Sequence, residues 1–179
     1  GVSVTHLVAD PDQAADVVVE LTASQGVVQL ADGRRVDGFM LNGTSPGPTI
    51  EAVQGQLIEV RVHNQNVAEG MTLHWHGVNV PNGADGVAGV TQDAIPPGGD
   101  YVYRFVAKDV GTYWYHSHQV SHAQVLGGLF GALVVRPADH SATSDTVALL
   151  HTYDGVRRIN GRAGDSSLAA APGELVRVR

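Results

Sequence analysis

The hydrophobic and polar positions of this chain alternate with a period of two over several short segments. Ile58, Val60 and Val62 fall on one face of an extended segment. Glu59 and Arg61, the residues between them, fall on the opposite face, as in a half-buried β-strand. The clearest predicted strands are 16–21, 35–41, 56–62, 100–106 and 129–135. Helical periodicity is not sustained anywhere, and only residues 121–126 are predicted to form a short helical turn.

Turn-forming residues separate these segments. The chain has 22 glycines and 8 prolines, and stretches 43–48, 81–86 and 96–99 have the composition of turns. Short strands between such turns are typical of an all-β sandwich or barrel. With 43% hydrophobic residues, the chain has enough apolar side chains for a packed core.

The chain also resembles itself at a fixed distance. Asn42-Gly43 is followed by Gly-Gln-Leu-Ile-Glu-Val-Arg at 55–61, and Asn160-Gly161 is followed by Gly-Glu-Leu-Val-Arg-Val-Arg at 173–179. Both pieces are displaced by 118 residues. This equal spacing predicts one β-domain followed by the beginning of another.

We therefore place one domain at 1–137 and a second, truncated unit at 138–179, and we interpret the chain as a fragment. The second unit has strand-like residues at 146–150 and 174–178, which are too few for two sheets. Native proteins pair or cover open strand edges. We expect the chain to associate with the rest of its parent protein or with copies of itself.

Composition excludes several functions. The formal net charge is −7, which argues against nucleic-acid or anionic-membrane partners. No apolar run reaches the roughly 18 residues of a transmembrane helix. Cysteine is absent, which excludes disulfides, thiolate nucleophiles, cysteine-based zinc or iron–sulfur sites and the thiolate of a blue-copper centre. Nine histidines, against eleven Lys and Arg together, are the first indication of metal chemistry.

Four of these histidines occur in two His-x-His motifs. Residues 71–77 read Met-Thr-Leu-His-Trp-His-Gly, and residues 111–118 read Gly-Thr-Tyr-Trp-Tyr-His-Ser-His. In a strand, residues i and i+2 point to the same face, so two such strands side by side would bring four imidazoles together. Imidazole binds Cu, Zn, Fe and Ni, so the pattern predicts a metal site without naming the metal.

Together with their context, these motifs resemble the first two copper motifs of the multicopper oxidases, the laccase-like enzymes. The resemblance is dense over residues 40–136. Its further parts are Asn42-Gly43 with Pro-Gly-Pro-Thr-Ile at 46–50, Asp85-Gly86, Thr91-Gln92, Ile-Pro-Pro-Gly at 95–98 and Gly-Gly-Leu-Phe-Gly-Ala-Leu-Val-Val at 127–135.

The resemblance implies a cupredoxin-like Greek-key β-sandwich and a trinuclear copper cluster at a domain interface, where dioxygen is reduced to water. It implies that His74 binds the type 2 copper and His76 a type 3 copper. His116 and His118 would bind the two type 3 coppers. Asp85 matches a carboxylate that assists proton delivery and orients a ligand or water; the alternative is an ordinary turn aspartate before a glycine. The family also implies a secreted or extracytoplasmic protein.

The sequence departs from the family pattern in two respects. The family cluster needs eight histidines, and the other four belong to a later domain. The type 1 copper needs a cysteine, whereas Ser117 stands between His116 and His118. We therefore expect no type 1 site here, and we expect Ser117 only to preserve strand geometry.

The remaining candidates have weaker support. His122 is either an outer-sphere group of the cluster or a polar residue of a local turn. Trp75 and Trp114 are expected to face away from the metal and to pack in the core, and Met40 and Met71 are expected to be core residues. Four histidines without a partner at ligand spacing are expected to be exposed or locally hydrogen-bonded: His6, His63, His140 and His151.

The leading functional hypothesis is a fragment of a multicopper oxidase that takes electrons from a phenolic, amine or metal donor and passes them to dioxygen. The alternative is a non-catalytic copper-binding or copper-storage module. A cupin-like metal enzyme is disfavoured, because it needs an acidic residue shortly after His76, where the sequence reads Gly-Val-Asn-Val-Pro. A copper nitrite reductase is disfavoured because its first domain should carry the cysteine ligand.

Overall fold

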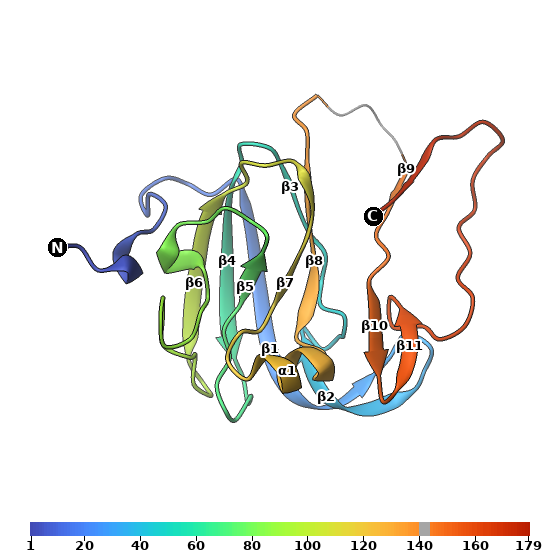
Figure 1. The fold of residues 1–179 in the computed structure, drawn as a ribbon, viewed down its shortest axis with the longest axis horizontal. Helices are drawn as coiled ribbons and strands as arrows, with labels where there is room; N and C mark the ends of the chain where they lie inside the picture. Colours follow the sequence, from blue (N-terminus) through green and yellow to red (C-terminus); the bar gives the residue numbers. More distant parts are fainter. Residues whose placement is uncertain (140–143) are drawn as a thin grey trace.

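Two four-stranded sheets form the main body of the chain (Figure 1). The computed structural model describes residues 1–139 and 144–179. The first sheet has the order β2 (Arg35–Leu41), β1 (Val17–Gln29), β4 (Leu57–Asn64) and β6 (Asp100–Val106). The second has the order β3 (Ile50–Val53), β8 (Phe130–Arg136), β7 (Gly111–His116) and β5 (His74–His76).

The described residues contain three short helices. Helix η1 (Val4–His6) precedes β1, whereas η2 (Asn82–Ala84) and α1 (Ser121–Gly127) lie in connections between strands. The all-β sandwich and the helical turn near residue 121 are thus confirmed. No helix within ranges 1–139 and 144–179 is long and apolar enough to cross a membrane.

Strand β1 is longer than the alternation predicts, because two different partners hold its two halves. Residues 17–23 pair in parallel with β4, and residues 23–29 pair antiparallel with β2. The second half contains Ser24, Gln25 and Gly26, which hide the period-two pattern. Pairing with β2 therefore decides where β1 ends, at Gln29.

Trp75 lies at the centre of the core between the sheets. Its side chain is 0% exposed, and its ring lies 4.7 Å from that of Phe105, 5.5 Å from that of Tyr103 and 5.8 Å from that of Tyr115. Its indole N–H donates to the backbone carbonyl of Ala84 at 2.9 Å. The core packing predicted for Trp75 is confirmed.

The chain after β8 forms two small pairs of strands. Strands β9 (Ser144–Thr146) and β12 (Val176–Val178) pair in parallel, and β10 (Leu150–Tyr153) and β11 (Val156–Ile159) form an antiparallel hairpin. The strand predicted at 146–150 is therefore wrong: residues 147–149 are not extended in a strand, because its two ends pair with different partners. Of the strand predicted at 174–178, the last three residues form β12.

The internal repeat has a structural counterpart at its asparagine turns. Asn42 and Asn160 both have a positive φ, of 53° and 50°. The Asn42 side-chain oxygen accepts from the Thr22 backbone N–H at 2.7 Å, and that of Asn160 accepts from the Leu149 N–H at 2.9 Å. Matching β-bridges close the two turns: Leu41 with Thr44 and Ile159 with Arg162. The 118-residue repeat thus reproduces a local turn geometry as well as a sequence.

The β10–β11 hairpin packs against the two four-stranded sheets through buried side chains. Tyr153 is 2% exposed, and its hydroxyl lies 2.6 Å from the Ser45 hydroxyl. The His151 ring lies 4.3 Å from the ring of Phe130. Tyr153 and Phe130 form a second small core with Val28 and Leu30. The hairpin labelled β10 and β11 in Figure 1 is therefore held on the first unit by apolar contacts and a hydrogen bond.

An ion pair at the edge of this contact makes its stability depend on pH. The Asp32 carboxylate accepts from the backbone N–H of Arg34, and it pairs with Arg158 at 3.0 Å. These contacts, with the Arg34 N–H as the larger cause, lower the pKa of Asp32 to about 2. Because the folded-state pKa is depressed, the stabilisation is present above about pH 4 and is lost as the pH falls toward 2.

Above pH 4, we expect the Asp32→Asn variant to have a lower melting temperature than the wild-type chain. This gap in melting temperature should close as the pH approaches 2. Thermal unfolding of both chains at steps between about pH 5 and pH 2 measures this gap. Asp154→Asn is the control, because its pair with Arg34 is 59% exposed on both sides and should contribute little. A gap of the same size at every pH would contradict the assignment.

Candidate metal centre

The two His-x-His motifs lie on neighbouring strands. In the antiparallel pair of β5 and β7, His74 is opposite His116 and His76 is opposite Trp114. The ring centre of His74 lies 5.8 Å from that of His76, 5.4 Å from that of His116 and 5.3 Å from that of His118. The predicted convergence of four imidazoles is confirmed. His118 reaches the group from the segment after β7, which ends at His116.

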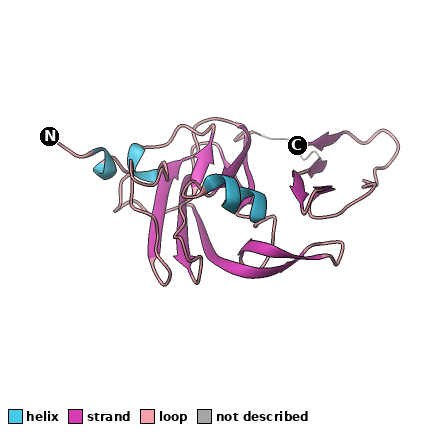
Figure 2. Ribbon diagram, turned by 60° about the horizontal axis from the view of Figure 1, so that its bottom comes forward, coloured by secondary structure: helices cyan, strands magenta, loops and turns pink. Residues whose placement is uncertain are grey.

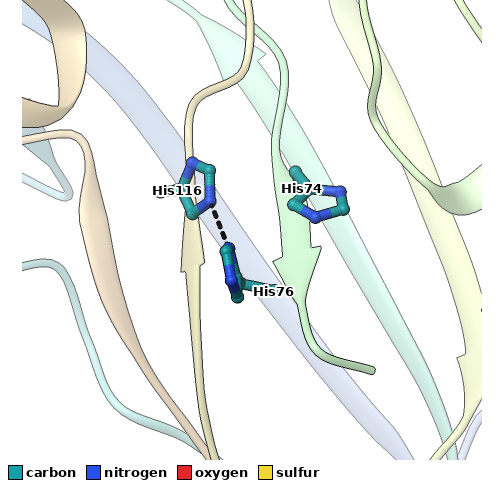
Figure 3. Close-up of side chains that lie close together, drawn as sticks. All are labelled: His74, His76 and His116. Carbon is teal, nitrogen blue, oxygen red and sulfur yellow. Dashed lines mark hydrogen bonds between the residues drawn. The ribbon is translucent and has the colours of Figure 1, made fainter. Parts of the chain in front are cut away.

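Nitrogen atoms of three rings face one another. Ligand nitrogens of His74, His76 and His116 all lie within 4.8 Å of one another. Two of them, His76 Nδ1 and His116 Nε2, are 3.2 Å apart (Figure 3). Two nitrogens that each lie about 2.0–2.1 Å from one tetrahedral ion are separated by roughly 3.3 Å. The spacing of these two nitrogens therefore fits two ligands of a single metal ion.

Backbone carbonyls orient two of the rings. His74 Nδ1 lies 2.7 Å from the carbonyl oxygen of Asp85, and His116 Nδ1 lies 2.9 Å from that of Ser117. A carbonyl oxygen only accepts, so both Nδ1 atoms carry the hydrogen in the neutral rings. Nε2 of each ring is then left with a free lone pair, as metal ligation requires.

Asp85 lies beside the histidines, as predicted. Its carboxylate Oδ1 is 3.3 Å from His74 Nδ1, and its side chain is 34% exposed. The shorter contact comes from its backbone carbonyl rather than from its carboxylate. The residue thus holds His74 through the main chain and presents an acidic group to solvent at the same place.

Burial keeps the innermost histidine neutral. His116 is 7% exposed, and burial lowers its pKa to about 4, with a smaller contribution from the neighbouring histidines. The neutral imidazole is the form that binds a metal ion.

Trp114 packs on the second small core, but the prediction that it faces away from the metal is wrong, because its ring stacks on the histidines. Its ring centre lies 4.1 Å from that of His116, with 30° between the planes, and 5.0 Å from that of His76, at 28°. Trp114 precedes His116 by two residues on β7, so both side chains lie on the same face. The alternation that grouped the histidines is the signal that should have placed Trp114 with them.

Ser117 does more than preserve strand geometry, and it lies beyond the end of β7. Its buried hydroxyl donates to the side-chain oxygen of Gln124, which is buried in α1. The Gln124 amide donates in turn to the carbonyl of Gly70 at 2.8 Å. This link ties α1 to the end of the histidine strand, and local sequence spacing carried no signal for it.

The other histidines lie apart from the group. His122 is exposed on α1, and the group of converging nitrogens does not include it. His6 is exposed and the His63 side chain is 44% exposed, as predicted, and His63 is bonded to Asp100 at 2.8 Å. The prediction for His151 is wrong: its ring packs on Phe130, and it bonds to the Leu126 carbonyl, 25 residues away, at 3.1 Å. His140 lies outside the described residues. Met71 is buried in the main core and Met40 packs on the second, as expected.

Comparisons with known proteins agree with this geometry. The family model described as multicopper oxidase matches residues 22–140. The chain is 38% identical over 125 residues to a copper resistance protein A homolog of Pseudomonas syringae pv. tomato, covering 70% of this chain and 20% of that protein. It is 43% identical over 113 residues to Laccase-1 of Botryotinia fuckeliana, covering 62% of this chain and 20% of that protein.

A solved structure supports the same class. The fold is similar to the crystal structure of a multi-copper oxidase from Pseudomonas thermotolerans, with a TM-score of 0.76 and 28% identity, over 84% of this chain and 42% of that one. The fold is thus cupredoxin-like, as expected. The chain belongs to the multicopper oxidase family, and copper is the metal that this family implies. It spans about a fifth of the length of the curated relatives named here.

Proposed function

We propose that this chain supplies half of the histidine ligands of a trinuclear copper cluster. The parent protein would be a multicopper oxidase that oxidises phenolic, amine or metal donors and reduces dioxygen to water. One observation carries the proposal: three imidazoles from strands β5 and β7 converge with that of His118, and two of their nitrogens, on His76 and His116, are 3.2 Å apart.

The ligand assignment follows the family order and the measured contacts. We assign His76 and His116 to one type 3 copper, because their facing nitrogens have the spacing of two ligands on one ion. His74 is assigned to the type 2 copper and His118 to the other type 3 copper. Imidazole nitrogens are suitable ligands for copper.

Bound copper would supply the one-electron redox chemistry, and the residues of this chain hold the site in shape. The carbonyls of Asp85 and Ser117 keep Nδ1 of His74 and His116 protonated, which leaves Nε2 free. Trp114 stacks against one side of His76 and His116 and restricts the movement of their rings. Reduction of dioxygen to water consumes protons, and the partly exposed Asp85 carboxylate is placed to deliver them beside His74.

The rest of the cluster requires a partner. We propose that residues 1–137 form one cupredoxin-like domain and residues 138–179 begin a second, since the Asn42 and Asn160 turns share one geometry. The remaining domains of the parent chain would supply the other four histidines and the type 1 copper. An assembly of identical chains is the other arrangement that closes the site. We place the parent protein outside the cytoplasm, as the resemblance implies.

A non-catalytic copper-binding or copper-storage module is the second candidate. The absence of cysteine from the sequence favours it for this chain taken alone, because no type 1 site can form from these residues.

The isolated chain is expected to bind copper but to show no laccase-type oxidation and no blue thiolate-to-copper band. Copper analysis, absorption spectroscopy and an oxidase assay with a phenolic donor measure the three properties. Adding the remaining parent domains should restore oxidation. Turnover by the pure chain would contradict the proposal, whereas copper binding without turnover in the complete parent would favour the storage module.

A further inference from the structure

The first residues of the chain contact the turn that carries Asp85. They lie outside the family match, which begins at residue 22. Helix η1 lies beside η2 in both ribbon views (Figures 1 and 2). The carbonyl of Leu7 accepts from the backbone N–H of Gly83 in η2 at 2.9 Å. A segment far away in sequence is therefore bonded to the turn two residues before Asp85.

Arg104 fastens this segment to the first sheet. Its guanidinium donates to the backbone carbonyls of Asp10, at 3.0 Å, and Gln13, and it pairs with the buried Glu59 carboxylate. The pKa of Glu59 is lowered, mainly by the hydrogen bond from Arg61 and also by the one from Arg104. The Glu59 carboxylate therefore remains ionised and holds Arg104 in place. The segment before Asp10 is thus tethered at one end and lies against Gly83 at the other.

The approach at Gly83 leaves no room for a side chain. A Cβ atom there would lie 2.6 Å from the Thr5 carbonyl oxygen and 2.7 Å from Val8 Cγ1. The φ of Gly83 is not positive, so its backbone conformation is open to alanine. The contact with the first residues, rather than backbone strain, is what requires glycine here.

The turn at residues 83–85 connects the contact with the first residues to the histidine centre through hydrogen bonds. Three consecutive carbonyls accept hydrogen bonds from side chains: Gly83 from Tyr101 (2.8 Å), Ala84 from Trp75 (2.9 Å) and Asp85 from His74 (2.7 Å). Gly83 is therefore held through its N–H by Leu7 and through its carbonyl by Tyr101. The Asp85 carbonyl, which accepts from His74 Nδ1, is the last of these three.

We propose that residues 3–8 form a positioning strap, which holds the turn 82–86 where the Asp85 carbonyl accepts from His74 Nδ1. The strap prepares Nε2 of His74 for the type 2 copper without touching the metal. This inference rests on the proposed function only in naming the ion. Orientation of His74 is a property of the metal-free chain.

Three variants of the full chain test the strap: Gly83→Ala, deletion of residues 1–8, and the two combined. Long-range ¹H–¹⁵N NMR of the metal-free protein at about pH 8, where imidazoles are neutral, reports which ring nitrogen carries the hydrogen. We expect His74 to change from the Nδ1–H form to a mixture in both single variants. Gly83→Ala should add nothing after the deletion, because its clash is then gone.

His116 is the internal control, because the Ser117 carbonyl holds it independently of the turn. A change at His74 alone supports the strap. An unchanged His74 in both single variants, or an equal change at His116, would overturn it. Copper titration should show a roughly tenfold loss of affinity in the same variants, the usual effect of removing an orienting partner. If the wild-type chain bound no copper but His74 responded, the proposed function would fail and the strap would stand.

Discussion

Changing His74 and His76 together to alanine is expected to abolish copper binding at the centre and to leave the fold intact. Loss of an orienting partner alone costs 10- to 100-fold in metal affinity, so loss of two ligands should exceed about 100-fold. His74 is half-buried and His76 is exposed, so the free energy of unfolding should change by less than about 1 kcal/mol. Copper stoichiometry after dialysis and urea unfolding measure the two effects.

A matched control removes two histidines away from the centre. His6 is exposed and His63 pairs with Asp100, so the His6→Ala, His63→Ala double variant should keep its copper. Unchanged copper stoichiometry in the His74, His76 variant would show that the first motif is not a ligand pair.

Trp75→Ala is expected to lower the free energy of unfolding by about 3–5 kcal/mol, the usual cost of truncating a buried aromatic residue to alanine. The side chain is 0% exposed and packs against three aromatic rings. The change also leaves the Ala84 carbonyl without its indole donor. Urea unfolding, followed by circular dichroism, measures the loss.

Trp114→Ala is the matched comparison, because the second tryptophan is only partly buried and stacks on the histidines. Its expected cost in unfolding is smaller, about 1 kcal/mol, and its main effect should be weaker copper binding. Equal losses of stability in the two variants would contradict the different roles assigned to Trp75 and Trp114.

The local pattern of the sequence was enough to predict five of the eight strands of the two main sheets, because apolar residues record which parts of a strand are buried. Strands 35–41 and 100–106 were predicted with their observed bounds. The prediction at 146–150 was wrong, because its two ends pair with β12 and β11. Strand pairing depends on residues far away in the chain, which local periodicity does not record.

The candidate metal centre, too, was predicted in part by local sequence and was completed only by long-range contacts. The first His-x-His motif by itself determined that His74 and His76 share a face, since neighbours i and i+2 in a strand do so, whereas His118 lies beyond the end of β7. Only the tertiary structure decided that His74 faces His116 and that Trp114 faces His76, because the register of β5 against β7 joins residues some 40 positions apart. The Asp85 carbonyl that orients His74, and the contact of Leu7 with Gly83, arise from backbone positions in the folded chain. Backbone carbonyl groups are common to all residues, so the pattern of side chains in the sequence does not predict these contacts.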